Sequence, residues 1–239
     1  MSQVIALVSA VRVGAVRTHL WDGREYASGA LKEPVPGPVW LGKLGFAGDE
    51  QADRVHHGGP DKAVLCYAAQ HYARWAEEQG LSLPVGGFFE NVTLTGPDGS
   101  DAPDERSVLL GETWRLGGAL VQVSQPRSPC YKLARRWRVP DLVARVQQTG
   151  WSGWYLRVLE PGRVSAGDPV VLVGRPAGAP PVGAVARILN VDKNDLAGAR
   201  WLLGVPDLPE RWRQKLLDRL AGREADDSAR LAGPDWCGS

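Results

Sequence analysis

One cysteine in a basic, proline-stiffened loop is the strongest candidate for chemistry in this chain of 239 residues. The segment VQVSQPRSPCYKL runs from an alternating strand pattern into a loop that holds Cys130 between Arg127 and Lys132. Nearby cations lower the pKa of a thiol, and the thiolate is the form that attacks electrophiles or binds a soft metal. Cys130 is therefore a candidate nucleophile or metal ligand. The alternative is a buried cysteine that packs as a small apolar group.

A polar loop directly before an apolar strand is a candidate anion site. The segment GDEQADRVHHGGPDK ends at Lys62 and is followed by AVLCY. Gly58 and Gly59 permit positive φ, so that successive backbone N–H groups can face one concavity, and Lys62 adds a positive charge. The loop could hold a phosphate, although the same residue types fit an ordinary turn. The adjacent His56 and His57 lack the spacing of a zinc site, so we expect no zinc site built from protein ligands alone.

Glu90 and Asn91 begin another strand pattern, directly after Phe88 and Phe89, in the segment GGFFENVTLT. A carboxyl group that is desolvated by aromatic rings has a raised pKa, which suits proton donation near neutral pH. Glu90 is therefore a candidate general acid. The alternative is a solvated glutamate at the start of a strand.

Other groups give weaker signals. The three cysteines are far apart, which leaves no CxxC motif and disfavours a disulfide framework, and we expect Cys66 in the core and Cys237 in a tail without a role. The runs RRWR and RWR mix basic and aromatic residues, but a net charge of +1 argues against a nucleic-acid binder. The chain has neither a signal-peptide pattern nor a long apolar run, so we expect a cytoplasmic protein that does not contact membranes.

The elements that position these residues are mainly strands. Apolar residues make up 44% and charged residues 23% of the chain, which is typical of a folded globular protein. Short apolar or alternating runs predict strands over Val4–Val13, Pro38–Leu41, Ala63–Tyr67, Asn91–Leu94, Val108–Leu116, Ala119–Ser124, Gly153–Leu159 and Pro169–Val173. Helical patterns interrupt them only at 69–79 and 141–148, and this spacing favours a β-barrel over a parallel doubly wound sheet.

The pattern changes after GRPAGAPP, a run of turn-forming residues at 174–181. Beyond it, helical spacing of apolar residues predicts helices over 182–191, 196–203 and 209–220. The fold class is therefore mainly β with α: a barrel domain over 1–174, a small helical bundle over 182–222 and a flexible tail over 223–239.

In their order and spacing these segments resemble the MOSC family, named after the C-terminal part of molybdenum cofactor sulfurases, and especially its stand-alone bacterial members with a helical extension. The resemblance covers nearly all of residues 1–220. It rests on a set of motifs along the chain: VGAVR, PVPGPVWLGKLGFAGDEQAD, HHGGPDKAVLCY, FENVTLTG, LLGETWRLGGALVQVSQPRSPCYKL, GWYLRVLEPGRVSAGD and VARILNVDKND.

The resemblance implies a β-barrel that binds the pterin form of the molybdenum cofactor, with Cys130 as the ligand of molybdenum. Cations and backbone donors would then hold the phosphate and the pterin, a role that we assign to Lys62, Arg127, Gly58, Gly59, Asp61 and Lys132. One departure concerns the residue before the Glu-Asn pair, which is usually a glycine in the family and is Phe89 here. A phenylalanine at this position could narrow the pocket or turn Glu90 aside.

The activity implied by the resemblance is the reduction of N-hydroxylated compounds, such as hydroxylaminopurines, amidoximes and hydroxylamines, with electrons from an external reductase. In this hypothesis Glu90 donates a proton, while Asn91 and His57 position the substrate or the cofactor. The alternative is a protein that only carries the molybdenum cofactor, or a persulfide on Cys130, to another enzyme. We expect a monomer or a homodimer.

Overall fold

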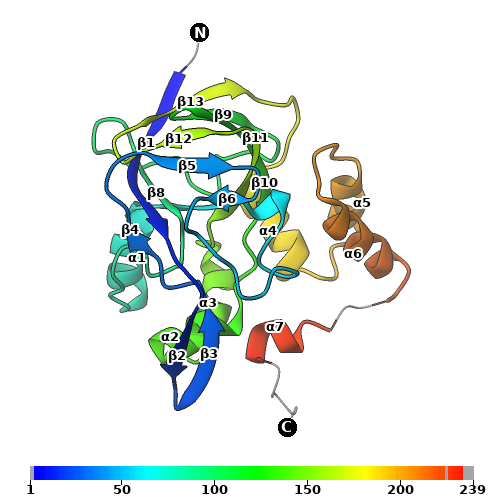
Figure 1. Ribbon diagram of the computed structural model, residues 1–239. Coiled ribbons are helices and arrows are strands. Elements are labelled where there is room, and N and C mark those ends of the chain that lie inside the picture. Colours follow the sequence, from blue (N-terminus) through cyan, green and yellow to red (C-terminus); the bar gives the residue numbers. More distant parts are fainter. Residues whose placement is uncertain (1–2, 224–225, 234–239) are drawn as a thin grey trace.

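The computed structural model describes residues 3–223 and 226–233, and its N-terminal part is a closed β-barrel (Figure 1). Seven strands hydrogen-bond in a ring in the order β1, β13, β9, β10, β11, β7, β8 and back to β1. They are β1 (Gln3–Val13), β7 (Val64–Ala68), β8 (Val92–Thr95), β9 (Thr113–Leu116), β10 (Ala119–Pro126), β11 (Trp154–Glu160) and β13 (Pro169–Gly174). Within the ring only β7 and β8 run parallel. The prediction of a barrel is confirmed.

The interior of the barrel is filled because successive strand residues point to opposite sides of the sheet. In β10, for example, Val121 and Val123 are fully buried, whereas their neighbour Gln122 lies on the other face and is partly exposed. Trp114 and Trp154 meet edge to face in the interior, with ring centroids 6.2 Å apart. The barrel is therefore a packed core, and a ligand site has to lie in the loops around it.

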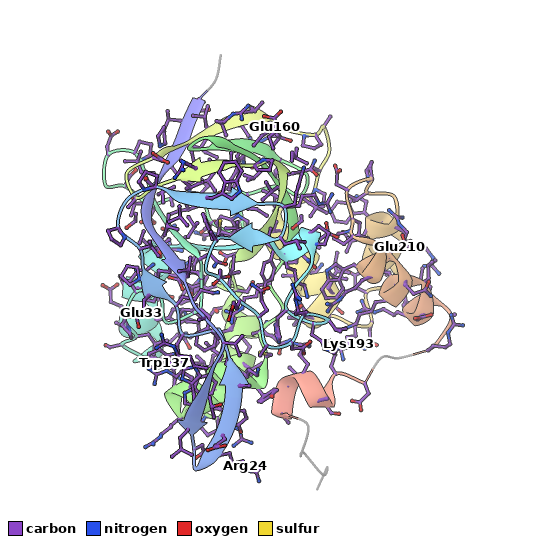
Figure 2. All side chains as sticks on the ribbon, in the orientation of Figure 1. Arg24, Glu33, Trp137, Glu160, Lys193 and Glu210 are labelled. Carbon is purple, nitrogen blue, oxygen red and sulfur yellow. The ribbon has the colours of Figure 1, made fainter. Side chains whose placement is uncertain are left out.

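Short strands decorate the barrel, and of these the sequence predicted only β5, as the run Pro38–Leu41. The pair β1 and β4 (Glu33–Pro34) extends the main sheet. A small sheet contains β5 (Val39–Gly42), β6 (Gly45–Phe46) and β12 (Gly162–Val164), and a hairpin contains β2 (Arg17–Trp21) and β3 (Arg24–Ser28). Figure 2 shows that Arg24 marks the tip of this hairpin, at the opposite end of the molecule from Glu160.

Three helices pack below the barrel as it is drawn in Figure 1, namely α1 (Gln70–Gln79), α2 (Tyr131–Trp137) and α3 (Leu142–Thr149). The first connects the parallel strands β7 and β8, as a parallel pair requires a crossover. Their apolar faces share one cluster that includes Tyr67, Trp75, Phe88, Leu133 and Val146. The sequence predicted α1 and α3 but missed α2, whose short segment YKLARRW is rich in basic residues.

The C-terminal helices are α4 (Val182–Asn190), α5 (Leu196–Leu203) and α6 (Glu210–Leu220), close to their predicted positions. They lie beside the barrel in Figure 1 and pack against it. Val182 is part of the barrel core, Leu110 of the barrel region is part of the helical core, and Trp212 Nε1 donates a hydrogen bond to Gln125 Oε1 at 2.5 Å. Contacts therefore cross the boundary that the sequence predicted at 174–181.

A short helix, α7 (Ser228–Ala232), lies in the segment that the sequence analysis assigned to a flexible tail. Charge contacts hold this helix. Asp227 pairs with Lys193 at 3.0 Å and with Lys215 at 3.1 Å, and Arg230 donates a hydrogen bond to the Pro129 carbonyl at 2.7 Å. Lys193 is labelled on this side of the molecule in Figure 2. The expectation of a tail is corrected for residues 226–233, while Cys237 lies outside the described residues.

No helix in the described part of the chain is both long and apolar enough to cross a membrane.

Candidate active site at the barrel mouth

Loops from several parts of the chain enclose a cleft beside Cys130, which we call the first cleft. It has a volume of about 710 Å³, including the solvent space at its opening. Six residues that the sequence analysis assigned to the site lie on its wall: His57, Lys62, Asn91, Arg127, Cys130 and Lys132. The fold thus brings together the polar loop before β7, the entry to β8 and the basic loop after β10.

Cys130 precedes the first residue of α2 and has an extended backbone, with φ −127° and ψ 165°. Its thiol is free and its side chain is largely buried, yet it lines the cleft. Lys62 lies with Cys130 on the walls of the same cleft, and Lys132 lines it as well. Cys130 therefore combines access to the cleft with a cationic neighbourhood, as a nucleophile or a soft metal ligand requires.

Lys62 lies in a short 3₁₀ helix, η1 (Pro60–Lys62), and its ammonium donates a hydrogen bond to the His56 carbonyl. Burial, followed by the positive charge of Arg211, lowers the pKa of Lys62 to about 8. At pH 7 the side chain is still mostly protonated, but it releases a proton far more easily than an exposed lysine does.

His57 is a neutral group in this site. Burial, followed by the positive charge of Lys62, lowers its pKa to about 4. At pH 7 the imidazole can accept or donate a hydrogen bond, but it holds no extra proton to give away.

A buried polar cluster supports the wall at Asn91. The Asn91 amide donates to Asp49 Oδ2 at 3.0 Å and to the Arg12 carbonyl at 3.2 Å, and its oxygen accepts from the Leu65 N–H at 3.1 Å. Asp49 also forms an ion pair with Lys32, whose pKa is lowered by burial. Asn91 is therefore held by protein partners on all sides. Lys32 was missed in the sequence because it lies in an irregular segment far from the other site residues.

The structure places Glu90 outside the cleft. Its side chain is fully buried, and its Oε1 accepts hydrogen bonds from the Tyr72 hydroxyl at 2.7 Å, the Gly86 N–H at 2.9 Å and the Thr93 hydroxyl at 2.9 Å. Its neighbours Phe89 and Asn91 line the cleft, whereas Glu90 points to the opposite side. The expectation that this carboxyl faces the substrate pocket is therefore corrected: residues 89–91 precede β8, Phe89 has a left-handed backbone, and the Glu90 carboxyl enters a buried hydrogen-bond cluster instead.

Phe89 has an uncommon backbone for a residue with a side chain, with φ +66°. The left-handed region costs such a residue about 1–2 kcal/mol. The phenyl ring lines the first cleft and also packs in the apolar cluster with Tyr72 and Leu133, so that burial of the ring offsets the strain.

Three further residues that the sequence analysis assigned to cofactor binding shape the loop without lining the first cleft. Gly59 has φ +99°, and a Cβ on Gly58 would lie 2.9 Å from the Arg54 carbonyl oxygen. The Asp61 carboxylate forms an ion pair with Arg157 at 2.8 Å. The direct role of Gly58, Gly59 and Asp61 in binding stays a prediction, and the structure shows that they shape the loop that carries Lys62.

A second cleft opens on the other side of Cys130, with a volume of about 1620 Å³ including solvent space. It shares six wall residues with the first cleft: Asp53, His57, Lys62, Ser128, Cys130 and Tyr155. The helical extension forms its far wall with Arg211, Trp212, Lys215 and Arg230. The run RWR at 211–213, which gave only a weak signal in the sequence, contributes Arg211 and Trp212 to this cleft.

Arg127 provides a buried cation without a complete set of partners. Its residue is 5% exposed, and no described residue accepts a hydrogen bond from its Nη1. A buried guanidinium is stable when an anion or an acceptor approaches it. Because Arg127 lines the first cleft beside Cys130, a ligand that fits here carries an anionic or strongly accepting group.

Comparison with known proteins identifies the two parts of the chain. Residues 53–171 match the model of the MOSC domain, and residues 180–223 match that of the YiiM-like, 3-alpha helix domain. The uncharacterized protein YflK of Bacillus subtilis is 40% identical over 92% of this chain and 98% of its own length. A protein of Gibberella moniliformis named "Reductase" is 34% identical over 78% of this chain, which matches only 33% of that longer protein.

The fold has a close counterpart among solved structures. The crystal structure of YiiM from Geobacillus stearothermophilus superposes with a TM-score of 0.72 and is 35% identical, covering 92% of this chain and 100% of that one. The superposition includes both the barrel and the helical extension.

Proposed function

From the premise that this chain belongs to the MOSC family and carries a YiiM-like helical extension, we propose that it is an oxidoreductase that uses the molybdenum cofactor to reduce N-hydroxylated compounds. The observation that carries the proposal is the free thiol of Cys130 on the wall of a cleft that contains a buried arginine with an unpartnered nitrogen. The relative named "Reductase" supports the class of reaction.

The residues of the first cleft fit the molybdenum cofactor. No group of three or more His, Cys, Asp or Glu side chains in the described ranges could hold a metal ion, so a metal bound at Cys130 has to bring most of its own ligands. The dithiolene sulfurs of the pterin do this, and thiolate is a suitable further ligand for such a soft centre. Arg127 and Lys132 would hold the phosphate and the pterin, and Lys32 and Lys62 are two further cations on the wall.

Reduction of an N–OH group to N–H and water consumes two electrons and two protons. When bound, the cofactor supplies the oxygen-accepting, two-electron chemistry, and an external reductase returns the electrons. The protein's own residues supply protons, orientation and exclusion of water. In the first cleft Asn91 holds the wall in place, neutral His57 orients a polar group, and the Phe89 ring limits the space.

Lys62 takes the place of Glu90 as the group that we propose to donate a proton. It lies on the wall of both clefts with Cys130, whereas Glu90 lies on neither wall. Its lowered pKa of about 8 matches the requirement that a general acid be protonated at neutral pH and still release its proton readily.

The test is an analysis of molybdenum and pterin in protein produced with molybdate and a complete cofactor pathway. We expect wild type to contain both and Cys130→Ser to lose most of the molybdenum, since a hydroxyl is a poor substitute for a soft thiolate ligand. Cys66→Ala is the matched control, because the Cys66 thiol is fully buried in β7 and its pKa is raised by burial.

Turnover distinguishes an enzyme from a carrier. Loaded wild type should reduce a hydroxylamine with an artificial electron donor, and Cys130→Ser should not. Equal molybdenum in wild type and Cys130→Ser would overturn the assignment of the ligand. Normal molybdenum without any reduction would instead identify the protein as a carrier of the cofactor.

A further inference from the structure

We propose that the second cleft binds a phosphate group of the substrate, so that this protein acts on N-hydroxylated nucleoside monophosphates rather than on free bases alone. The nature of the reaction rests on the function proposed above, whereas the binding of a nucleoside monophosphate does not.

The two clefts form one continuous site around Cys130. They share its side chain together with Lys62 and Tyr155, but their outer walls differ. The first cleft continues to Phe89 and Asn91 in the barrel loops, and the second continues to α6 and α7. A cofactor held in the first cleft would leave the second as the space through which a substrate approaches.

Cations from the helical extension line the second cleft. Arg211 and Lys215 come from α6, and Arg230 comes from α7. Lys215 and Arg230 are balanced in part by Asp227, which also pairs with Lys193, so this single carboxylate serves three cations.

Arg211 forms no ion pair of this kind. Its guanidinium lies over the Trp212 ring at 5.1 Å from the ring centroid, and it forms no ion pair with any described residue. The other carboxylates of the cleft are engaged elsewhere: Asp53 binds His56 at 2.9 Å, and Asp226 is exposed and accepts from the Ser228 N–H at 2.8 Å. The guanidinium of Arg211 is exposed and faces the cleft with no described carboxylate at ion-pair distance, although the charge of Asp227 acts on it from further away.

Several cations lie close together on this side of the second cleft. Partial burial lowers the pKa of Arg211, and the Arg211 charge in turn lowers the pKa of Lys62, so the two cations repel each other across the cleft. A phosphate between them would relieve this repulsion and accept charge-assisted hydrogen bonds from both. A guanidinium is well suited to this role because its planar fork matches two phosphate oxygens.

These features favour a nucleotide over a free base. A base placed at Cys130 has no negative charge for Arg211, whereas the 5′-phosphate of the corresponding nucleotide extends away from the base. The same cations attract the anion over a distance and raise its local concentration at the site.

Calorimetric titration with adenosine 5′-monophosphate, with adenosine as the uncharged control, tests the binding without any turnover. We expect wild type to bind the monophosphate at least tenfold more tightly than adenosine, and Arg211→Gln to lose this difference. Arg211→Lys should retain part of it. Arg200→Gln is the matched control, since Arg200 is an exposed arginine of α5 that lies on neither cleft wall. Equal affinity of wild type for the two probes overturns the proposal. It is also overturned if Arg200→Gln loses the preference for the monophosphate as fully as Arg211→Gln does.

Kinetics with a hydroxylaminopurine, supplied as the free base and as the monophosphate, tests the substrate class. We expect Arg211→Gln to raise KM for the monophosphate about tenfold and to leave KM for the base unchanged. A reduced pterin content in Arg211→Gln would show that Arg211 holds the phosphate of the cofactor, which overturns the proposal. If no substrate is reduced while monophosphate binding still depends on Arg211, the reductase function fails and the phosphate site stands.

Discussion

Two polar regions of this molecule meet at Glu90, whose sequence neighbours Phe89 and Asn91 line the first cleft, and the two regions behave in different ways. The first, the Glu90 cluster, consists of Arg12, Tyr72, Glu90 and Thr93, and its hydroxyl and backbone donors converge on Glu90 Oε1. The second is the pair of clefts around Cys130, where the buried Arg127 has an unpartnered nitrogen and the exposed Arg211 forms no ion pair with a described residue. A carboxylate oxygen that accepts several protein donors stabilises a fold, whereas cations that line a cleft without such partners are available to a ligand.

The difference shows that burial alone does not identify a catalytic carboxyl group. Glu90 is more deeply buried than any cation of the clefts, and its Oε1 accepts three hydrogen bonds from the protein, whereas no described residue donates a hydrogen bond to its Oε2. The mutations below test whether the Glu90 cluster contributes mainly stability and the clefts contribute mainly activity.

The largest effect is expected from truncation after Arg175, which removes the outer wall of the second cleft. It also takes Val182 from the barrel core and leaves Leu110 and Gln125 without their partners in the helices. We expect most of the truncated protein to be insoluble, because an apolar face becomes exposed. Size-exclusion chromatography of the soluble fraction measures this. A monodisperse and equally active truncated protein would show that the helices contribute nothing to the site or to the core.

The next largest effect is expected from Lys62→Gln, which removes the cation that the two clefts share. We expect kcat to fall about 10²-fold, the lower end of what a general acid contributes, while Tm stays close to that of wild type. In wild type kcat should fall as the pH rises through about 8, since the Lys62 ammonium loses its proton there. The variant should not show this decrease in kcat.

The comparison for Lys62 is Lys43→Gln, since Lys43 donates to backbone carbonyls of Val158 and Leu159, away from the clefts. An unchanged pH profile in Lys62→Gln would rule out Lys62 as the proton donor.

Glu90→Gln tests the Glu90 cluster. Replacing the carboxylate weakens charge-assisted hydrogen bonds, so we expect the free energy of unfolding to fall by about 2 kcal/mol. Urea denaturation measures this change, and kcat and molybdenum content should stay within threefold of wild type. A large loss of kcat at normal stability would show that Glu90 takes part in the reaction, and it would contradict the placement of Glu90 outside the clefts.

The smallest effect concerns Phe89, which lies at the border between the two regions. Because φ is +66° at this position, Phe89→Gly should be more stable than Phe89→Ala by about 1 kcal/mol, although both lose the buried ring. Chemical denaturation of the two variants gives the difference. The control pair is Glu77→Gly and Glu77→Ala in α1, where the helical backbone should favour alanine. Equal stabilities of the two Phe89 variants would mean that the backbone relaxes out of the left-handed region.

The sequence predicted those structural features that a single local pattern of residues determines. The alternating runs predicted the barrel strands, and the basic loop pointed to Cys130, because the loop carries its own cations. The direction of Glu90 was not predictable in this way, since Phe88 and Phe89 are consistent both with a pocket and with a buried cluster.

Long-range contacts account for the other differences. Lys32 lines the cleft only because it pairs with Asp49, and α7 is held by Asp227 through ion pairs with Lys193 and Lys215. Such pairs join segments that no local window of sequence contains, and their residue types are those of an ordinary surface.

The pairing of β1 with β13 sets the order of events during synthesis of this protein. The ring closes when Gln3 pairs with Leu172 and Leu7 pairs with Pro169, so the first strand of the barrel to be synthesised remains unpaired on this edge until its last strand is made. Until then one edge of β1 is open to pairing with another chain, which is the state in which a nascent sheet aggregates. Contacts of such long sequence separation also slow folding. Proper assembly of this protein therefore depends on the cell's ability to protect that edge while the intervening residues are translated.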